Sequence, residues 1–206
     1  HKARKSGKTQ LVHRLQELML RSGANVLMSI RRVTSINKRK RTPGIDKILI
    51  KTNQARWDLF VEISSMKQKD WVNIAKPVNR IYIPKPNGKL RSLGIPTIKD
   101  RILQNMVKNA LEPEWEAIFE SSSYGFRPGR GCHDALSRIF TLTARHKTRL
   151  WVLNADIKDC FYNIDHSFLI EALGGFPANN VIEAWLKAGY CEFRSSDLIE
   201  VLADTP

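Results

Sequence analysis

The sequence has 206 residues and a formal net charge of +14, from 34 lysines and arginines against 20 aspartates and glutamates. A chain of this length buries one core of ordinary size or parts of two lobes, and its charge favours a polyanionic partner such as nucleic acid. An ordinary basic protein without such a partner is the alternative. No run of about 18 apolar residues occurs, so we expect no membrane span and no membrane partner.

The cysteine pattern does not favour a disulfide framework. Cys132, Cys160 and Cys191 are odd in number, widely separated and form no Cys-x-x-Cys pair. This pattern predicts reduced thiols, no zinc site and a location in bacterial cytoplasm or an organellar matrix. Because the chain begins without Met and ends in a polar stretch, we expect it to be part of a longer protein.

The N-terminal segment is predicted to be basic and helical. Residues 1–8 are expected to form a flexible basic arm. Apolar residues at helical spacing then predict a helix that ends at Ser22 and Gly23, and residues 24–35 predict a second helix. The apolar residues of the first helix are Leu11, Leu15, Leu18 and Met19.

A cationic loop is predicted at 37–41, before the turn signals of 42–46. Such a run of charge either binds RNA phosphates or is a solvated face. Its cations are Lys38, Arg39, Lys40 and Arg41. A helix is predicted over 53–69, and we interpret its apolar residues as core rather than as a base-stacking platform. These residues are Trp57, Phe60, Val61 and Ile63.

The middle of the chain predicts a β-hairpin followed by a helix. Residues 78–84 alternate like a strand, Asn87-Gly88 is a strong hairpin signal, and residues 90–96 return as the second strand. Thr97 is expected to cap the next helix together with Asp100, and Pro113 to close it. A loop at 121–131 and a helix at about 132–146 come next.

The last third centres on an apolar strand predicted at 151–155. It delivers Asp156 to its end, as polymerases carry their first metal-binding carboxylate, although a simple helix or turn cap is the alternative. Helices are expected near 167–173, capped by Asp165, and near 179–189. A closing hairpin is expected from 191–193 and 198–202.

Five blocks in this order carry a family resemblance. They read RTPGID at 41–46, YIPKPNGKLRSLGIPTIKDR at 82–101, LEPEWE at 111–116, YGFRPGRGCHDAL at 124–136 and ADIKDCFYNIDH at 155–166. Together they closely resemble the reverse transcriptases encoded by bacterial and organellar group II introns, which also act as splicing maturases. The resemblance covers nearly the whole chain.

The resemblance implies an α/β fold with a helical N-terminal extension, the fingers and a partial palm of a right-handed polymerase. The implied boundaries are 1–40, 41–140 and 141–206. In the family, a QGG-type motif and a Tyr-x-Asp-Asp hairpin with two more acids follow, and the 206 residues contain neither. The chain also departs from the family at Asp159, where a small residue such as glycine is usual, and at Tyr162, where an acid is common.

The resemblance also assigns the nucleotide site. Asp156 and the carbonyl oxygen of Ile157 would bind Mg²⁺, two ions of which act in the complete active site. The backbone N–H groups of Asp159 and Cys160 would face the triphosphate, as an anion nest does. Phe161 resembles the steric gate that excludes a ribose 2′-hydroxyl, with a packed core phenylalanine as the alternative.

Cations of the hairpin and of the 121–131 loop are the remaining residues expected to contact the nucleotide or the template. Lys85 and Arg91 are expected to contact the triphosphate, although Lys89 could serve in place of Lys85. Arg127 and Arg130 suit template phosphate or sugar contacts, and a capped loop with solvated arginines is the alternative.

The leading hypothesis is therefore an RNA-directed DNA polymerase of group II intron type. Its expected partners are intron RNA, an RNA template with a DNA primer, and dNTP. A C-terminal half or a second chain would supply the Tyr-x-Asp-Asp motif, and this chain alone is expected to be inactive. A non-catalytic RNA-binding module that helps intron RNA to splice is the alternative. A related reverse transcriptase of a bacterial defence system is a third and weaker possibility.

Overall fold

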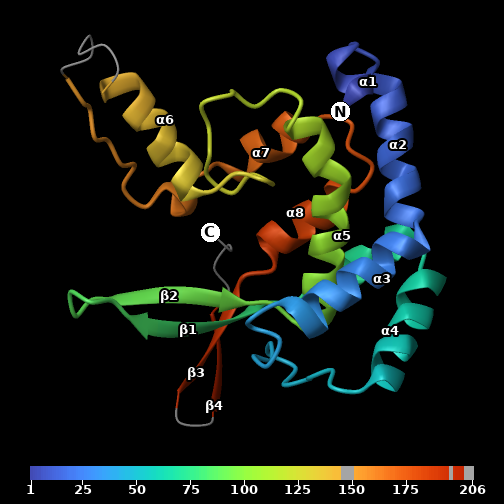
Figure 1. Cartoon of the computed structure of the whole chain (residues 1–206). Helices are drawn as coiled ribbons and strands as arrows, with labels where there is room; N and C mark the ends of the chain where they lie inside the picture. Colours follow the sequence, from blue (N-terminus) through green and yellow to red (C-terminus); the bar gives the residue numbers. More distant parts are fainter. Residues whose placement is uncertain (145–150, 195–196, 202–206) are drawn as a thin grey trace.

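The computed structural model describes residues 1–144, 151–194 and 197–201, and helices predominate in it (Figure 1). The first part contains α1 (Lys2–Lys5), α2 (Thr9–Arg21), α3 (Gly23–Arg31), the π-helical turn η1 (Arg32–Ile36), α4 (Asn53–Ser65) and the 3-10 helix η2 (Gln68–Ile74). The second part contains β1 (Val78–Pro84), β2 (Leu90–Ile95), α5 (Ile98–Trp115), α6 (Cys132–Ala144), η3 (Cys160–Tyr162), α7 (His166–Leu173), α8 (Asn179–Lys187), β3 (Tyr190–Arg194) and β4 (Asp197–Val201). No helix in the described ranges is long and apolar enough to cross a membrane.

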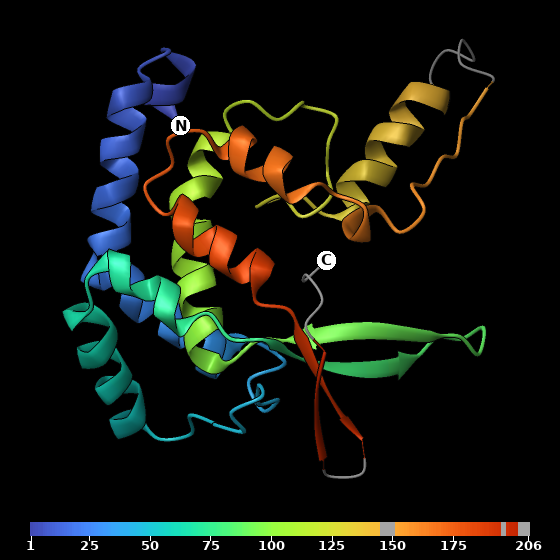
Figure 2. The same cartoon turned by 180° about the vertical axis from the view of Figure 1, so that it is seen from behind.

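Helix α5 forms the centre of the hydrophobic core. Its Ile102 and Leu103 are fully buried, because α2 and α3 pack on one side of the helix and α8 crosses the other (Figures 1 and 2). The same cluster takes one or more side chains from each surrounding helix, among them Leu20, Ile30, Ile63 and Val181. This core holds the N-terminal helices and α8 as one unit.

The start of α5 is fixed by side-chain caps, as predicted. The Thr97 hydroxyl accepts a hydrogen bond from the Asp100 N–H at 3.1 Å and donates one to the Asp100 carboxylate at 2.7 Å. Trp185 of α8 donates its indole N–H to the same carboxylate at 3.0 Å. Burial nevertheless raises the pKa of Asp100 above its ordinary value, against the effect of these hydrogen bonds. Pro113 does not close the helix, which continues to Trp115, because one missing N–H near a helix end disturbs few bonds.

A mixed four-stranded sheet, in the order β2-β1-β3-β4, confirms the α/β class. The predicted hairpin is antiparallel, with Ile83 opposite Arg91, and it projects away from the helices (Figure 1). Gly88 has φ of 77°, the left-handed conformation that the hairpin turn requires. The second predicted hairpin is also confirmed as β3 and β4, and β3 pairs in parallel with β1.

Two predictions for the N-terminal segment are wrong. Residues 2–5 are helical rather than a flexible arm, because Ala3 is buried and Arg4 lies 3.5 Å from Glu114 of α5. Helix α2 also turns a different face inward. Val12, Gln16 and Leu20 are its buried residues. The predicted apolar stripe is exposed, namely Leu11, Leu15, Leu18 and Met19.

For helix α4, the prediction that its apolar residues form core is correct only in part. Ile63 is buried as predicted and Leu59 joins it, but Trp57 and Val61 are 55% and 52% exposed. The helix meets the rest of the fold mainly through α3, so only one narrow face is covered. Trp57 packs at its edge against Phe60, with ring centroids 5.2 Å apart.

Candidate nucleotide and nucleic-acid site

The segment that carries Asp156 is extended and exposed rather than a strand. Residues 151–157 form no strand, and Leu153 is 91% exposed. The predicted strand is therefore absent from this structure. The physical reason is that a strand is stabilised by a neighbour that pairs with it, and no described segment pairs with 151–157. The described part of the chain also gives the Asp156 carboxylate no hydrogen bond or ion pair, which removes support for the alternative of a structural cap.

A tight turn follows Asp156 and explains one departure from the family pattern. Asp159 has φ of 49°, in the left-handed region where glycine is favoured and Asp or Asn is tolerated. Its carbonyl oxygen accepts hydrogen bonds from the Tyr162 N–H and the Asn163 side chain, both at 2.9 Å. Asp165 then caps α7 by accepting from the Phe168 N–H at 2.7 Å, which confirms the role predicted for it.

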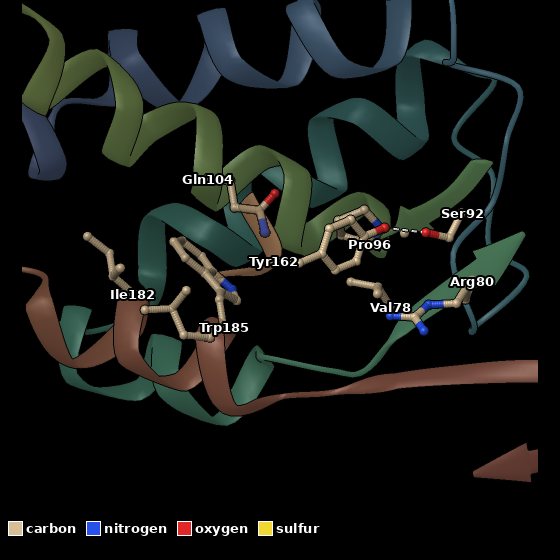
Figure 3. Close-up of a pocket in the computed structure, with 10 residues that line it drawn as sticks. Val78, Arg80, Ser92, Pro96, Gln104, Tyr162, Ile182 and Trp185 are labelled. Carbon is tan, nitrogen blue, oxygen red and sulfur yellow. Dashed lines mark hydrogen bonds between the residues drawn. The ribbon is translucent and has the colours of Figure 1, made fainter. Parts of the chain in front are cut away.

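Tyr162 joins this turn to the hairpin of the predicted fingers. Its hydroxyl is hydrogen-bonded to the Ser92 hydroxyl of β2, as the dashed line in Figure 3 marks. Both residues line a cavity of about 380 Å³ between the hairpin and the helices α5 and α8. The neighbouring Phe161 is 69% exposed, so it is not a core phenylalanine in this structure. Its assignment as the steric gate stays a prediction.

The hairpin places its cations on one face. Because directly opposed residues share a face and successive residues alternate, Lys85, Lys89 and Arg91 lie on the same side, and all three are exposed. Ser92 lies on the other side, toward Tyr162. The structure therefore does not bring Arg91 to the turn that follows Asp156.

A cation that the sequence analysis missed lies on the side of Tyr162. Arg80 of β1 lines the cavity together with Ser92 (Figure 3). Its guanidinium lies 3.2 Å from the centre of the Tyr190 ring. The alternation of strand residues could have found it, because Arg80 is an even-numbered strand residue that shares the face of Tyr82 and its partner Ser92.

The two arginines of the 121–131 loop hold that loop together. Arg127 has a side chain that is only 5% exposed and donates two hydrogen bonds to the Glu116 carboxylate, at 2.9 and 2.8 Å. The bond with Arg127 holds the pKa of Glu116 below its ordinary value. Another Arg127 nitrogen donates to the carbonyl oxygens of Glu120 and Ser123. Arg127 is therefore buried within the loop and not solvated as the alternative expected, and its template contact stays a prediction.

Arg130 is half-buried, and only one of its guanidinium nitrogens donates hydrogen bonds within the described residues. One of its guanidinium nitrogens donates to the carbonyl oxygens of Ser121 and Ser123, and its charge lies 5.5 Å from the Tyr124 ring. A phosphate contact by the other side of this guanidinium is compatible with these bonds.

The cationic loop at 37–41 is held by local hydrogen bonds, and its charged side chains are exposed. The Asn37 side chain accepts a hydrogen bond from the Arg39 N–H at 2.9 Å, and Lys40 donates to the Ser35 carbonyl oxygen at 2.7 Å. The side chains of Lys38, Arg39, Lys40 and Arg41 are all exposed. Four cations on one short turn form the most concentrated positive surface of the predicted RNA-binding residues.

The described residues supply too few carboxylates for a metal pair. They contain no group of three or more His, Cys, Asp or Glu side chains that could hold a metal ion. Asp156 offers the hard oxygen that Mg²⁺ prefers, but one carboxylate and one carbonyl oxygen do not complete its coordination. The described residues therefore offer the oxygen ligands that Mg²⁺ prefers, but too few of them to bind the ion.

Comparison with known families gives the class of protein to which this α/β chain belongs, a nucleic-acid polymerase. Residues 83–202 match the family described as reverse transcriptase (RNA-dependent DNA polymerase), and residues 1–63 match the N-terminal domain of reverse transcriptase. The chain belongs to the reverse transcriptase family. This family generally uses Mg²⁺.

Individual relatives point to introns. The chain is 42% identical over 129 residues to the group II intron-encoded protein LtrA of Lactococcus lactis. The aligned region covers 60% of this chain and 21% of LtrA. It is 40% identical over 146 residues to protein YkfC of Escherichia coli, covering 69% of this chain and 38% of YkfC. It is 32% identical over 78 residues to nuclear intron maturase 1, mitochondrial, of Arabidopsis thaliana, covering 38% of this chain and 10% of the maturase. The chain thus spans well under half the length of these relatives, and the group II intron resemblance is confirmed.

Proposed function

We propose that this chain supplies the fingers and the beginning of the palm of an RNA-directed DNA polymerase encoded by a group II intron. The same protein would assist splicing and mobility of its intron RNA. Residues 1–40 would form the N-terminal extension, 41–140 the fingers and 141–206 the start of the palm. The observation that carries the proposal is the exposed turn from Asp156 to Tyr162, attached to the finger hairpin through Ser92.

Asp156 and the Ile157 carbonyl oxygen would be ligands in a Mg²⁺ site that needs further carboxylates. The 206 residues contain no Tyr-x-Asp-Asp sequence to provide them. A C-terminal half or a second chain would supply them, so DNA synthesis by residues 1–206 alone is not expected. The partners would be intron RNA, an RNA template with a DNA primer, and dNTP.

The nucleotide contacts form a second part of the proposal. The backbone of Asp159 and Cys160 would face the triphosphate, and Phe161 would crowd the sugar. Arg91 and Lys85 lie on the hairpin face opposite Ser92, so they would reach the triphosphate only if the hairpin moved. Finger closure over a bound nucleotide is the kind of motion that could bring them there.

Phe161→Val is expected to raise the use of ribonucleotides relative to deoxynucleotides in the joined polymerase, meaning residues 1–206 connected to the Tyr-x-Asp-Asp hairpin and thumb of a group II intron-encoded relative. The smaller side chain leaves room for a 2′-hydroxyl, and one or two methylene-sized groups alter discrimination by about 10- to 200-fold. Single-nucleotide incorporation of dNTP and rNTP measures this ratio. Tyr162→Phe, which removes the bond to Ser92 but keeps the ring, is the control. An unchanged ratio in Phe161→Val would show that this ring is not the gate.

A non-catalytic RNA-binding module is the second candidate function. It is favoured by the exposed cations of the 37–41 loop and by the lack, among the described residues, of a group of three side chains that could hold a metal ion. The two candidates share the RNA surface and differ in whether Asp156 acts in synthesis.

A further inference from the structure

One side chain of α5, Arg101, is hydrogen-bonded to the cationic loop. This loop together with Thr42, residues 37–42, is called the basic loop. Arg101 Nε donates to the Pro96 carbonyl oxygen at 2.9 Å. Its two terminal nitrogens donate to the carbonyl oxygens of Arg39 at 3.3 Å and Thr42 at 2.5 Å. The guanidinium thus connects both halves of the loop to the end of strand β2.

The backbone of the basic loop is arranged so that its carbonyl oxygens face Arg101 and its cations face solvent. The Lys40 N–H donates to the Asn37 carbonyl oxygen at 3.1 Å, and the Thr42 N–H donates to the Arg39 carbonyl oxygen at 3.0 Å. These bonds form a compact double turn. The carbonyl oxygen of Arg39 is held inside it, whereas the side chain of the same residue is exposed.

Gly44, two residues after the basic loop, holds the adjoining chain against the start of α5 independently of Arg101. Its Cα is buried against the start of α5, where an added Cβ would lie 2.6 Å from Thr97 Cα and 2.9 Å from the Pro96 carbonyl oxygen. Both neighbours are backbone atoms at the capped N-terminal end of α5, which cannot shift without moving that helix end. Only glycine lets the chain approach this closely.

Arg101 itself is poorly placed to contact RNA. Its side chain is partly buried, and burial lowers the pKa of its guanidinium from the ordinary value, with Asp46 and Arg39 acting in opposite directions. Three of its nitrogens already donate to backbone carbonyl oxygens. A planar guanidinium forms such a three-way fork, which a lysine ammonium does not reproduce.

We propose that Arg101 is a positioning residue for RNA binding. It would contact no phosphate, but would hold the basic loop in one conformation so that the four exposed cations meet the RNA together. A loop that is already ordered loses less conformational entropy on binding, so the same contacts give a higher affinity. The inference rests on the proposed role of this loop in binding RNA.

The test uses Arg101→Lys, which keeps the charge and removes the fork. RNA affinity of residues 1–206 is measured with a labelled RNA hairpin over a series of KCl concentrations. We expect binding to weaken about tenfold at any one salt concentration, because the loop must then be ordered by the RNA. The slope of log K against log salt should not change, because the number of neutralised phosphates stays the same. Lys38→Gln should instead flatten the slope by about 0.9 for a duplex-like contact.

Gly44→Ala is the matched variant. Its added methyl group would push the chain that follows the basic loop away from the start of α5, and it changes no charge. It should reproduce the weaker binding and the unchanged slope of Arg101→Lys. Circular dichroism at the assay temperature verifies that each variant is folded. Leu20→Ala, which removes core contacts far from the loop, should bind RNA as the unaltered chain does, and thereby separates loop position from general destabilisation.

Two results would overturn the inference. Wild-type affinity in Arg101→Lys would show that the fork does not matter. A flattened slope in Arg101→Met would make Arg101 a direct phosphate contact. Failure of the underlying RNA role is distinguishable, since neutralising residues 38–41 would then change neither affinity nor slope.

Discussion

Asp156→Asn is expected to lower RNA-directed DNA synthesis by the joined polymerase about a thousandfold or more, while RNA affinity stays unchanged. The carboxylate would act on metal, and metal ions supply several kcal/mol of transition-state stabilisation, with a factor of ten for each 1.4 kcal/mol. Loss of folding is not expected to contribute, because the described part of the chain gives this side chain no partner. Primer extension on an RNA template and a parallel RNA-binding titration measure the two quantities.

Asp159→Asn is the matched control, with the same chemical change three residues away. Asn tolerates the left-handed conformation of this turn as well as Asp does, and the proposed role of residue 159 uses its backbone. Near-normal synthesis is therefore expected. If Asp156→Asn reduced RNA binding as strongly as synthesis, or if both variants lost activity equally, the metal-ligand role of Asp156 would be refuted.

Leu20→Ala is expected to lower the free energy of unfolding by about 2–5 kcal/mol, whereas Leu18→Ala changes it by less than about 0.5 kcal/mol. The two leucines are two positions apart on α2, but Leu20 is 1% exposed and Leu18 is 67% exposed. Only the first loses core contacts and leaves a cavity. Urea denaturation followed by circular dichroism measures both values. Equal losses in the two variants would mean that α2 is turned the other way in solution.

The face of α2 shows where sequence patterns stop being sufficient. Leu11, Leu15 and Leu18 follow a helical period, but so do Val12, Gln16 and Leu20. The choice between them is made by contacts from distant residues, since the Gln16 amide donates to Glu114 at 2.7 Å across 98 positions of sequence. An amide that is buried by such a contact cannot be recognised from the periodicity of apolar residues.

Features with local causes were predicted closely. The hairpin follows from Asn87-Gly88, and the start of α5 follows from Thr97 and Asp100, all within a few residues of the structure they specify. The strand expected at 151–155 depends instead on a neighbouring strand, and the described residues offer none. Strong apolar character alone does not order a segment that has no pairing partner.

In the candidate site too, features with local causes could be predicted from the sequence, whereas features that depend on distant residues could not. The departure at Asp159 is visible in the sequence alone, and the left-handed conformation found there accounts for Asp in a position where the family usually has glycine. The burial of Arg127 was not predicted, because its partner Glu116 lies outside the 121–131 loop and was not recognised from the sequence. Arg80 was missed because its relevance depends on which face of the hairpin meets Tyr162.

Primer extension on an RNA template, by residues 1–206 alone and by the joined polymerase, tests the central claim most directly. The claim is that this chain contributes one metal-binding carboxylate to a polymerase that needs others. The expected result is no DNA from residues 1–206 alone and Mg²⁺-dependent, Asp156-dependent DNA from the joined protein. Mg²⁺-dependent synthesis by the 206 residues alone, or none by a folded joined protein, would contradict it.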